Sequence, residues 1–463
     1  MLSLPFHVGP VSRLARSAAL LGGLTFAGGC ASLDPAPDVD RAEHLVADRA
    51  GALPDWTQPW EPALGLWDGH APLRLQTALE MALRNNRDLR AEVERIAASR
   101  ADLVQSGLLP NPVLGVTLRF PFDPISGGSF VGAQVVQAFT ALWLRDGRIA
   151  ASEARLNQTI LDVSDRALSL VAEVKASHAR LAFGQHLLQL GGQSVQVLEA
   201  STLAAEARVR AGEASQAEIT RALQAEAIAR AAQDGIVREL AKERRRLLEL
   251  IGFAGESAEW PVEEPPPPDP VPVIDEADAV MLAITQRLDT AAARLIVDAQ
   301  RAELSTEELS RLKDFGLGAD FEREVDGQRT IGPVIEASIP IFDTNQAQIA
   351  KAGALARASL AKYEAVRQRA IREVRVAWMG LAGATRLASQ FRERELALSE
   401  QLLALSQRSL ASGQGDLSGL LNARQMLLEA RSALVALERE ATLANINFER
   451  ALGGAIASNP GEH

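Results

Sequence analysis

Apolar residues recur every seven positions along the last long segment of the chain. The first series is Leu420, Leu427, Leu434, Ala441 and Phe448. A second series, three places further on, is Ala423, Ala430, Leu437, Ala444 and Ala451. A heptad repeat held this long predicts a coiled-coil seam rather than an ordinary amphipathic helix on a globular core. Alanine along one side of the seam predicts that the paired helices approach closely.

The same helical plan occurs twice in the chain. Gly212 matches Gly413 at an offset of 201 residues, and the same offset pairs Gln224 with Gln425, Arg230 with Arg431, Glu239 with Glu440, and Ile251-Gly252 with Leu452-Gly453. An ungapped match of this length predicts an internal duplication. We expect a first repeat over 72–252, a proline-rich linker over 253–274 and a second repeat over 275–453.

Each repeat is predicted to contain a helix, a β-hairpin, a very long helix and a last helix. The expected helices are 72–107, 148–210 and 215–251 in the first repeat, and 275–313, 346–411 and 416–452 in the second. A helix of about sixty residues would be roughly 90–100 Å long, far beyond the length of an average globular helix.

The two hairpins, about 113–143 and 315–341, alternate between apolar and other residues. Leu114, Val116, Leu118 and Phe120 share one face of the first strand, and Phe315, Leu317, Ala319 and Phe321 share one face of the third. We expect return strands over 130–143 and 331–341. Strands of about ten residues with one apolar face suit a transmembrane β-barrel. Asp320, Glu322 and Glu336 alternate with the apolar positions and would face the barrel lumen.

Four strands cannot close a membrane barrel, and open sheet edges cannot face lipid. The chain would therefore have to oligomerise, and three copies would supply twelve strands. The alternative is a soluble pair of hairpins that cap a helical bundle.

Residues 1–29 have the features of a secretory signal peptide, with two arginines, a short apolar run and small residues. Cys30 follows the small residues, as in the lipobox of bacterial lipoproteins, and we expect it to be lipidated. The alternative is a plain signal peptide with an incidental thiol. Ala31 at the next position favours the outer membrane. We expect 30–71 to form an extended tether and 454–463 a flexible tail.

Composition excludes several classes of function. The formal net charge is −11, and no basic face suggests a nucleic-acid partner. The single cysteine excludes internal disulfides and cysteine-based zinc sites. His178 and His186 share a helix, but we interpret them as packing or surface residues rather than metal ligands. The sequence contains no recognisable constellation of acid, base and nucleophile, so we predict neither an enzyme nor a bound cofactor or metal.

Residues 75–452 resemble the outer-membrane efflux protein family, the TolC-like channels. The resemblance rests on Leu109-Pro-Asn-Pro112, the Gly212 and Gly413 turns, the Leu-Gly helix ends and the stretch Ile339-Pro-Ile-Phe-Asp-Thr-Asn-Gln-Ala-Gln-Ile-Ala-Lys351. It implies a mainly α-helical homotrimer with a twelve-stranded barrel in the outer membrane and a helical tunnel in the periplasm. It also implies a periplasmic adaptor protein and an inner-membrane pump, of the resistance-nodulation-division type. The Phe-Asp-Thr-Asn-Gln stretch is most similar to the cobalt–zinc–cadmium and copper/silver resistance branch.

The resemblance also suggests where functional residues lie. The helix tips at Gly212-Glu213 and Gly413-Gln414 would contact the adaptor. The periplasmic gate of the family lies near the turn into the last helix, around Asp416, Gly419 and Asn422. The acidic rings of well-known members correspond to Gly419 and Asn422 here, so that carboxylate constriction does not carry over. Asp416 could form a ring in a trimer, but we favour its role as the N-cap of the last helix.

The resemblance therefore implies a passive exit duct of a tripartite efflux system, in which divalent heavy-metal cations pass solvated and are steered by acidic walls. The open alternatives are a multidrug or type I secretion duct, or a periplasmic coiled-coil scaffold lipoprotein without a barrel. A scaffold has no need of the apolar strand faces.

Overall fold

A computed structural model describes residues 32–57, 66–120, 128–253, 260–263, 274–311 and 315–454. Its helices and strands all belong to one compact unit that begins at Asp34. The predicted signal peptide, Cys30, most of the proline-rich linker and the tail beyond residue 454 lie outside the described residues.

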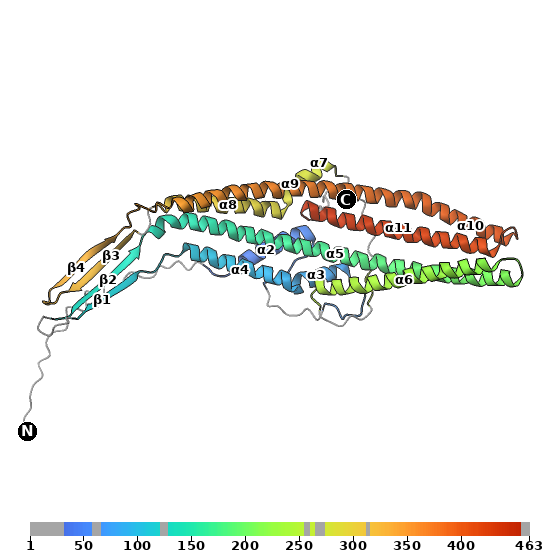
Figure 1. Ribbon diagram of the computed structural model, residues 1–463, viewed down its shortest axis with the longest axis horizontal. Helices are drawn as coiled ribbons and strands as arrows, with labels where there is room; N and C mark the ends of the chain where they lie inside the picture. Colours follow the sequence, from blue (N-terminus) through green and yellow to red (C-terminus); the bar gives the residue numbers. More distant parts are fainter. Residues whose placement is uncertain are drawn as a thin grey trace, which may run out of the picture. The chain divides into compact units, whose positions relative to one another are not determined.

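Both repeats have the predicted order of elements (Figure 1). The first contains α3 (Leu75–Asn85), α4 (Arg87–Gly107), β1 (Val113–Arg119), β2 (Phe130–Ala138), α5 (Thr140–Arg210) and α6 (Gln216–Leu250). The second contains α7 (Glu276–Gln286), α8 (Leu288–Leu309), β3 (Gly316–Arg323), β4 (Arg329–Glu336), α9 (Gln346–Gln390), α10 (Ala397–Ala411) and α11 (Leu417–Leu452). A π-helix, η1 (Phe391–Leu396), joins α9 to α10 without a break.

The helices pack in a defined lateral order. Helix α5 contacts α4 and α6 on one side and α8 and α11 on the other, and α9 contacts α8 and α11 in turn, while α10 contacts α11. The order is therefore α4/α6, then α5, then α8/α11, then α9/α10. The seam predicted on α11 is confirmed, since Leu427, Leu434, Ala441 and Phe448 are all buried. None of the described helices combines the length and apolar character needed to cross a bilayer.

Contacts at equivalent positions confirm the duplication. The side chain of Asn86, between α3 and α4, donates to the Leu250 carbonyl at 3.0 Å. Arg287, between α7 and α8, donates to the Ala451 carbonyl at 3.2 Å, and the repeat offset relates both of these positions to those of the first bond. The ion pair of Arg230 with Glu199 likewise has its counterpart in Arg431 with Glu400.

The long helices show where the two repeats differ by one residue. His178 on α5 bonds the Leu73 carbonyl through Nε2 at 3.0 Å, and Trp378 on α9 bonds the Ile274 carbonyl through Nε1 at 3.0 Å. Leu73 and Ile274 are 201 residues apart, which is the repeat offset. His178 and Trp378 are 200 residues apart, one fewer than that offset. The second repeat therefore contains one additional residue between Trp378 and Glu400. Helix η1 lies in that interval, and a π-turn is the helical form that accommodates one extra residue.

Two sequence expectations about the helices are wrong. Residues 36–50 form a helix, α2 (Ala36–Ala50), within the region expected to be an extended tether. Val39, Ala42 and Val46 lie on one buried face of α2 at helical spacing, and the helix packs against α5. The helices expected over 72–107 and 275–313 are each divided in two, because the chain is extended at Asn86 and Arg287.

The expected strand ends also require correction. Residues 140–143 belong to α5 rather than to the second strand, and β4 ends at Glu336 rather than near Ile341. The ladder stops where Phe139 donates its backbone N–H to the Phe315 carbonyl and the Thr140 hydroxyl accepts from the Phe315 N–H, both at 2.8 Å. A short apolar run does not by itself distinguish strand from helix, which explains the misplaced boundary.

Candidate functional site

The four strands form one antiparallel sheet in the order β1-β2-β3-β4. Strand β2 of the first repeat pairs directly with β3 of the second. Strands β1 and β4 each pair on one side only within the described residues. The sheet therefore ends in two open edges, each offering a row of backbone donors and acceptors to another chain.

The register places apolar side chains on one face of the sheet. Leu114 lies opposite Val135, which lies opposite Ala319, and Phe321 lies opposite Ile331. Most of this face is exposed, up to 79% for Ile331. An exposed apolar surface of this kind marks a contact with lipid or with another protein.

The opposite face carries the three acids predicted to face a lumen. Asp320, Glu322 and Glu336 alternate with the apolar positions and lie on this face together with Gln134 and Thr330 across the strands. Their common orientation agrees with the predicted alternation. That they line a channel stays a prediction, because it depends on how the sheet closes.

Two glycines of β3 lie at crowded points of the polar face. A Cβ at Gly318 would stand 2.2 Å from the Val135 carbonyl oxygen, and a Cβ at Gly316 would stand 2.9 Å from a methyl of Val136. No side chain fits at such distances. Crowding relieved by glycine is typical of the inner side of a curved sheet.

The two helix tips, α5–α6 and α10–α11, have the same geometry. Gly212 and Gly413 adopt left-handed backbone, with φ of 77° and 73°. The next residue closes the helix end, since Glu213 N–H bonds the Arg208 carbonyl at 2.8 Å and Gln414 N–H bonds the Ser409 carbonyl at 3.0 Å. These are Schellman ends, which need glycine at the left-handed position. Both tips are exposed, and contact with an adaptor stays a prediction.

Asp416 is the N-cap of α11, as predicted. Its Oδ1 accepts a hydrogen bond from the Gly419 N–H at 2.9 Å. Asp416, Gly419 and Asn422 are all exposed in the single chain. A gating role for these three residues stays a prediction.

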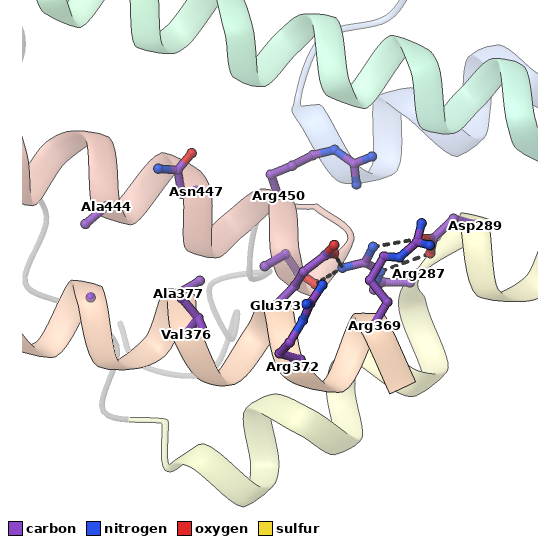
Figure 2. A pocket seen from close by; sticks show the side chains of 12 residues that line it. Arg287, Asp289, Arg369, Arg372, Glu373, Val376, Ala377, Ala444, Asn447 and Arg450 are labelled. Carbon is purple, nitrogen blue, oxygen red and sulfur yellow. Dashed lines mark hydrogen bonds and ion pairs between the residues drawn. The ribbon is translucent and has the colours of Figure 1, made fainter. Parts of the chain in front are cut away.

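Sequence reasoning missed a buried charged cluster around Arg287 (Figure 2). The Arg287 side chain is 6% exposed and binds Asp289 through two hydrogen bonds of 2.9 and 2.7 Å. It also lies 2.9 Å from Glu373 on α9. Burial lowers the pKa of Arg287, but Asp289 and Glu373 outweigh burial, so the pKa is raised and the charge is kept. The available signal was an arginine at the position where the first repeat has Asn86.

A second ion pair joins α11 to α5 beside this cluster. Arg450 Nη2 lies 2.7 Å from Asp165 Oδ2 and donates to the Ser169 hydroxyl at 2.9 Å. Burial raises the pKa of Asp165 despite the adjacent guanidinium. Arg287 and Arg450 also line a cavity of about 820 Å³, together with Arg369 and Arg372 of α9. Neither Arg369 nor Arg372 has an ion pair within the described part of the chain.

The two histidines of α5 occupy one packed and one surface position. His178 is buried and bonded to the Leu73 carbonyl, while His186 is exposed on the same helix. Burial lowers the pKa of His178. Across the described ranges, no group of three or more His, Cys, Asp or Glu side chains is placed to hold a metal ion.

Comparisons with known proteins agree with this geometry. Residues 279–454 match the family model described as outer membrane efflux protein. The cobalt-zinc-cadmium resistance protein CzcC of Cupriavidus metallidurans is 22% identical over 383 residues, which is 82% of this chain and 90% of CzcC.

Two solved structures have the same fold. A membrane protein from Pseudomonas aeruginosa superposes with a TM-score of 0.69 at 22% identity, covering 82% of this chain and 92% of that one. CusC, whose structures concern folding and transmembrane channel formation, gives 0.68 at 18% identity, covering 87% and 99%. The predicted fold, long paired helices with four β-strands per chain, is confirmed.

Proposed function

We propose that this chain is a member of the outer membrane efflux protein family and the outer-membrane exit duct of a tripartite efflux system for divalent heavy-metal cations. The observation that carries the proposal is the four-stranded sheet with an exposed apolar face and two open edges. Strands of seven to nine residues are about 24–31 Å long, close to the apolar band of an outer-membrane barrel. The proposed duct is passive and has no catalytic chemistry.

Closure by further copies of the chain follows from the order of its elements. The sheet has β1 of the first repeat at one edge and β4 of the second at the other. The helices have the same lateral order, with α4/α6 of the first repeat at one edge and α9/α10 of the second at the other. A single rotation can therefore join β4 to the next β1 and α9/α10 to the next α4/α6. A head-to-tail interface generates a ring when its rotation closes. Three copies give twelve strands, which supports a homotrimer.

The partners are assigned by position. The exposed tips at Gly212-Glu213 and Gly413-Gln414 lie at the ends of the helices remote from the strands and would meet a periplasmic adaptor (Figure 1). An inner-membrane pump of the resistance-nodulation-division type would supply the energy. Opening would then occur around Asp416, Gly419 and Asn422, where the last helix begins.

The acidic face of the sheet supports the transport of cations. Asp320, Glu322 and Glu336 would form rings of carboxylates in a closed barrel, and such a field raises the local concentration of cations. In planar bilayers, the double variant Asp320→Asn with Glu322→Gln should show a lower cation-to-anion permeability ratio than wild type. Glu324→Gln, outside the strands, is the control. An unchanged ratio in the double variant would place these acids outside the conducting path.

Growth of a deletion strain tests the substrate. The strain would be exposed to graded zinc, cobalt, cadmium and copper, and separately to detergents, dyes and antibiotics. Sensitivity confined to the metals and reversed by the intact gene is the expected result, since the relative CzcC is named for resistance to three of them. Sensitivity to drugs and detergents with normal metal tolerance would instead make the chain a multidrug duct.

A further inference from the structure

Helices α9 and α10 carry an apolar stripe that has no cover within the described chain. Its five members are between 49% and 59% exposed: Val376, Met379, Leu387, Leu398 and Leu405. They recur along one side of the two helices across η1. A continuous apolar stripe on a helix predicts a packed neighbour.

The duplication identifies what this stripe should pack against. Once the extra residue near η1 is allowed for, the equivalents on α5 are Ala176, Ala179, Leu187, Val197 and Ala204. All five belong to the cluster in which α5 packs on α11 through Leu421, Leu428, Val435 and Ile446. The counterpart of α11 in the first repeat is α6. By the repeat relation, the stripe on α9 and α10 is therefore expected to pack on an α6 helix.

Helix α6 of the same chain cannot fill that position, since it lies at the opposite end of the lateral order. The α6 positions equivalent to those α11 side chains are Thr220, Ala227, Asp234 and Arg245. The exposed apolar side chains of α6, Leu223, Ile228 and Val237, lie within three positions of them. The two surfaces lie at the two free edges of the helical layer. Another copy of the chain, placed head to tail, would bring one of these surfaces against the other.

At the repeat positions of the Arg450–Asp165 pair, α6 and α9 also carry opposite charges, but the sign on each helix is reversed. Within the chain, Arg450 of α11 binds Asp165 and Ser169 of α5. The counterpart of Arg450 on α6 is Glu249, which is exposed. The counterparts of Asp165 and Ser169 on α9 are Ala365 and Arg369. Neither Glu249 nor Arg369 has an ion pair within the described residues, and Arg369 borders the arginine-lined cavity (Figure 2).

We propose that Arg369 forms an ion pair with Glu249 of the partner subunit, and that the α9/α10 stripe packs on the partner's α6 beside it. This inference rests on the ring assembly proposed above and adds the residues that set its register. The proposed pair corresponds to the contact of Arg450 with Asp165 and Ser169 in each chain, with the charges exchanged and the α9 charge at the position of Ser169. It also brings a carboxylate to the rim of a cavity that four arginines line against two acids.

Charge reversal tests the pair. Arg369→Glu and Glu249→Arg should each speed dissociation of the detergent-purified oligomer, followed on native gels, by about tenfold or more, because each places like charges together. The double variant should return to within about threefold of wild type. The matched controls are Arg301→Glu and Asp298→Arg, at exposed positions of α8 without ion pairs in the described residues, and they should leave the rate unchanged.

Cross-linking gives a second measurement that does not introduce like charges. The double variant Arg369→Cys with Glu249→Cys, treated with a short bismaleimide, should give a ladder up to the full ring. The two single-substitution variants, Arg369→Cys and Glu249→Cys, should not, although both keep Cys30. An oligomeric wild type with no ladder and no rescue by the double reversal would overturn this inference and leave the duct intact. A monomeric wild type would overturn the assembly itself.

Discussion

The substitution Arg287→Leu removes the buried guanidinium and is the sharpest test of how α7 and α8 pack against α9. Leucine fills part of the volume but makes none of the polar contacts. The carboxylates of Asp289 and Glu373 and the carbonyl of Ala451 each lose a charged donor. The variant therefore leaves the carboxylates of Asp289 and Glu373 without the guanidinium that pairs with both.

The magnitude follows from how deeply these partners lie. Breaking a buried ion pair by removing one partner costs about 3–5 kcal/mol. The two carboxylates are partly exposed and water can solvate them, so we expect the lower end, about 3 kcal/mol. The entropy of unfolding for a chain of this length is about 1 kcal/mol/K. The thermal midpoint should then fall by about 3 °C.

The deficit should also depend on pH. Burial raises the pKa of Asp289, but its hydrogen bonds and charge contact with Arg287 outweigh burial and hold the pKa below 3.8. In the wild type, Asp289 thus adds stability above pH 3.8 that is lost as the pH falls through the lower, folded pKa. In the variant both contributions of Arg287 are lost, and burial is opposed only by the Thr290 N–H hydrogen bond and the charge of Arg450, so the folded pKa of Asp289 rises and protonation relieves the folded state. The difference between the two proteins should therefore shrink as the pH falls below about 5.

Circular dichroism melting of the purified protein in detergent, at pH 7 and pH 4, measures both effects. Arg301→Leu, an exposed arginine on α8, is the matched control and should change the stability by less than about 0.5 kcal/mol. Equal midpoints for Arg287→Leu and the control would refute the structural role of the cluster. A deficit that grows on acidification would refute the assignment of the uncompensated charge to Asp289.

Three further predictions concern the helices. Ala423→Glu, at a buried position of the α11 seam, should break the seam and leave the channel open or unassembled. Met426→Glu, on the exposed side of the same helix, should not. Single-channel conductance and native gels would distinguish the two variants. The wild type should lose stability as the pH falls below 6.5, because burial lowers the pKa of His178 and the unfolded state binds the proton first. His178→Gln should remove this loss, and equal pH slopes of the two proteins in thermal melts would contradict the prediction. Deletion of Glu393 within η1 should be tolerated, whereas deletion of Ala382 should rotate the residues up to η1 and lower the yield of assembled oligomer.

The features that the sequence predicted are those that arise from local pattern. The α11 seam, the strand alternation and the glycine turns each follow from side-chain periodicity or from backbone conformation within a few residues. Asp416 belongs with them, since an N-cap needs only the N–H groups of its own first turn. The faces of Asp320, Glu322 and Glu336 followed from a period of two residues.

The features that were missed depend on contacts distant in sequence. Helix α2 is short, and only its docking against α5 makes the spacing of Val39, Ala42 and Val46 decisive. The partners of Arg287 and Arg450 lie on other helices, so no spacing along the chain could reveal them. The end of β2 depended on the hydrogen bonds of Phe315, which belongs to the other repeat.

The one-residue difference between the repeats explains why a π-helix lies where it does. An extra residue in a regular α-helix rotates everything beyond it by about 100°. Val376 and Met379 before η1 would then lie on a different side from Leu398 and Leu405 after it. The π-turn takes up the extra residue, and the stripe continues across it on one side of the helix. The seam between α10 and α11 and the stripe at the free edge thus constrain the same helix, and η1 is the local distortion that satisfies both.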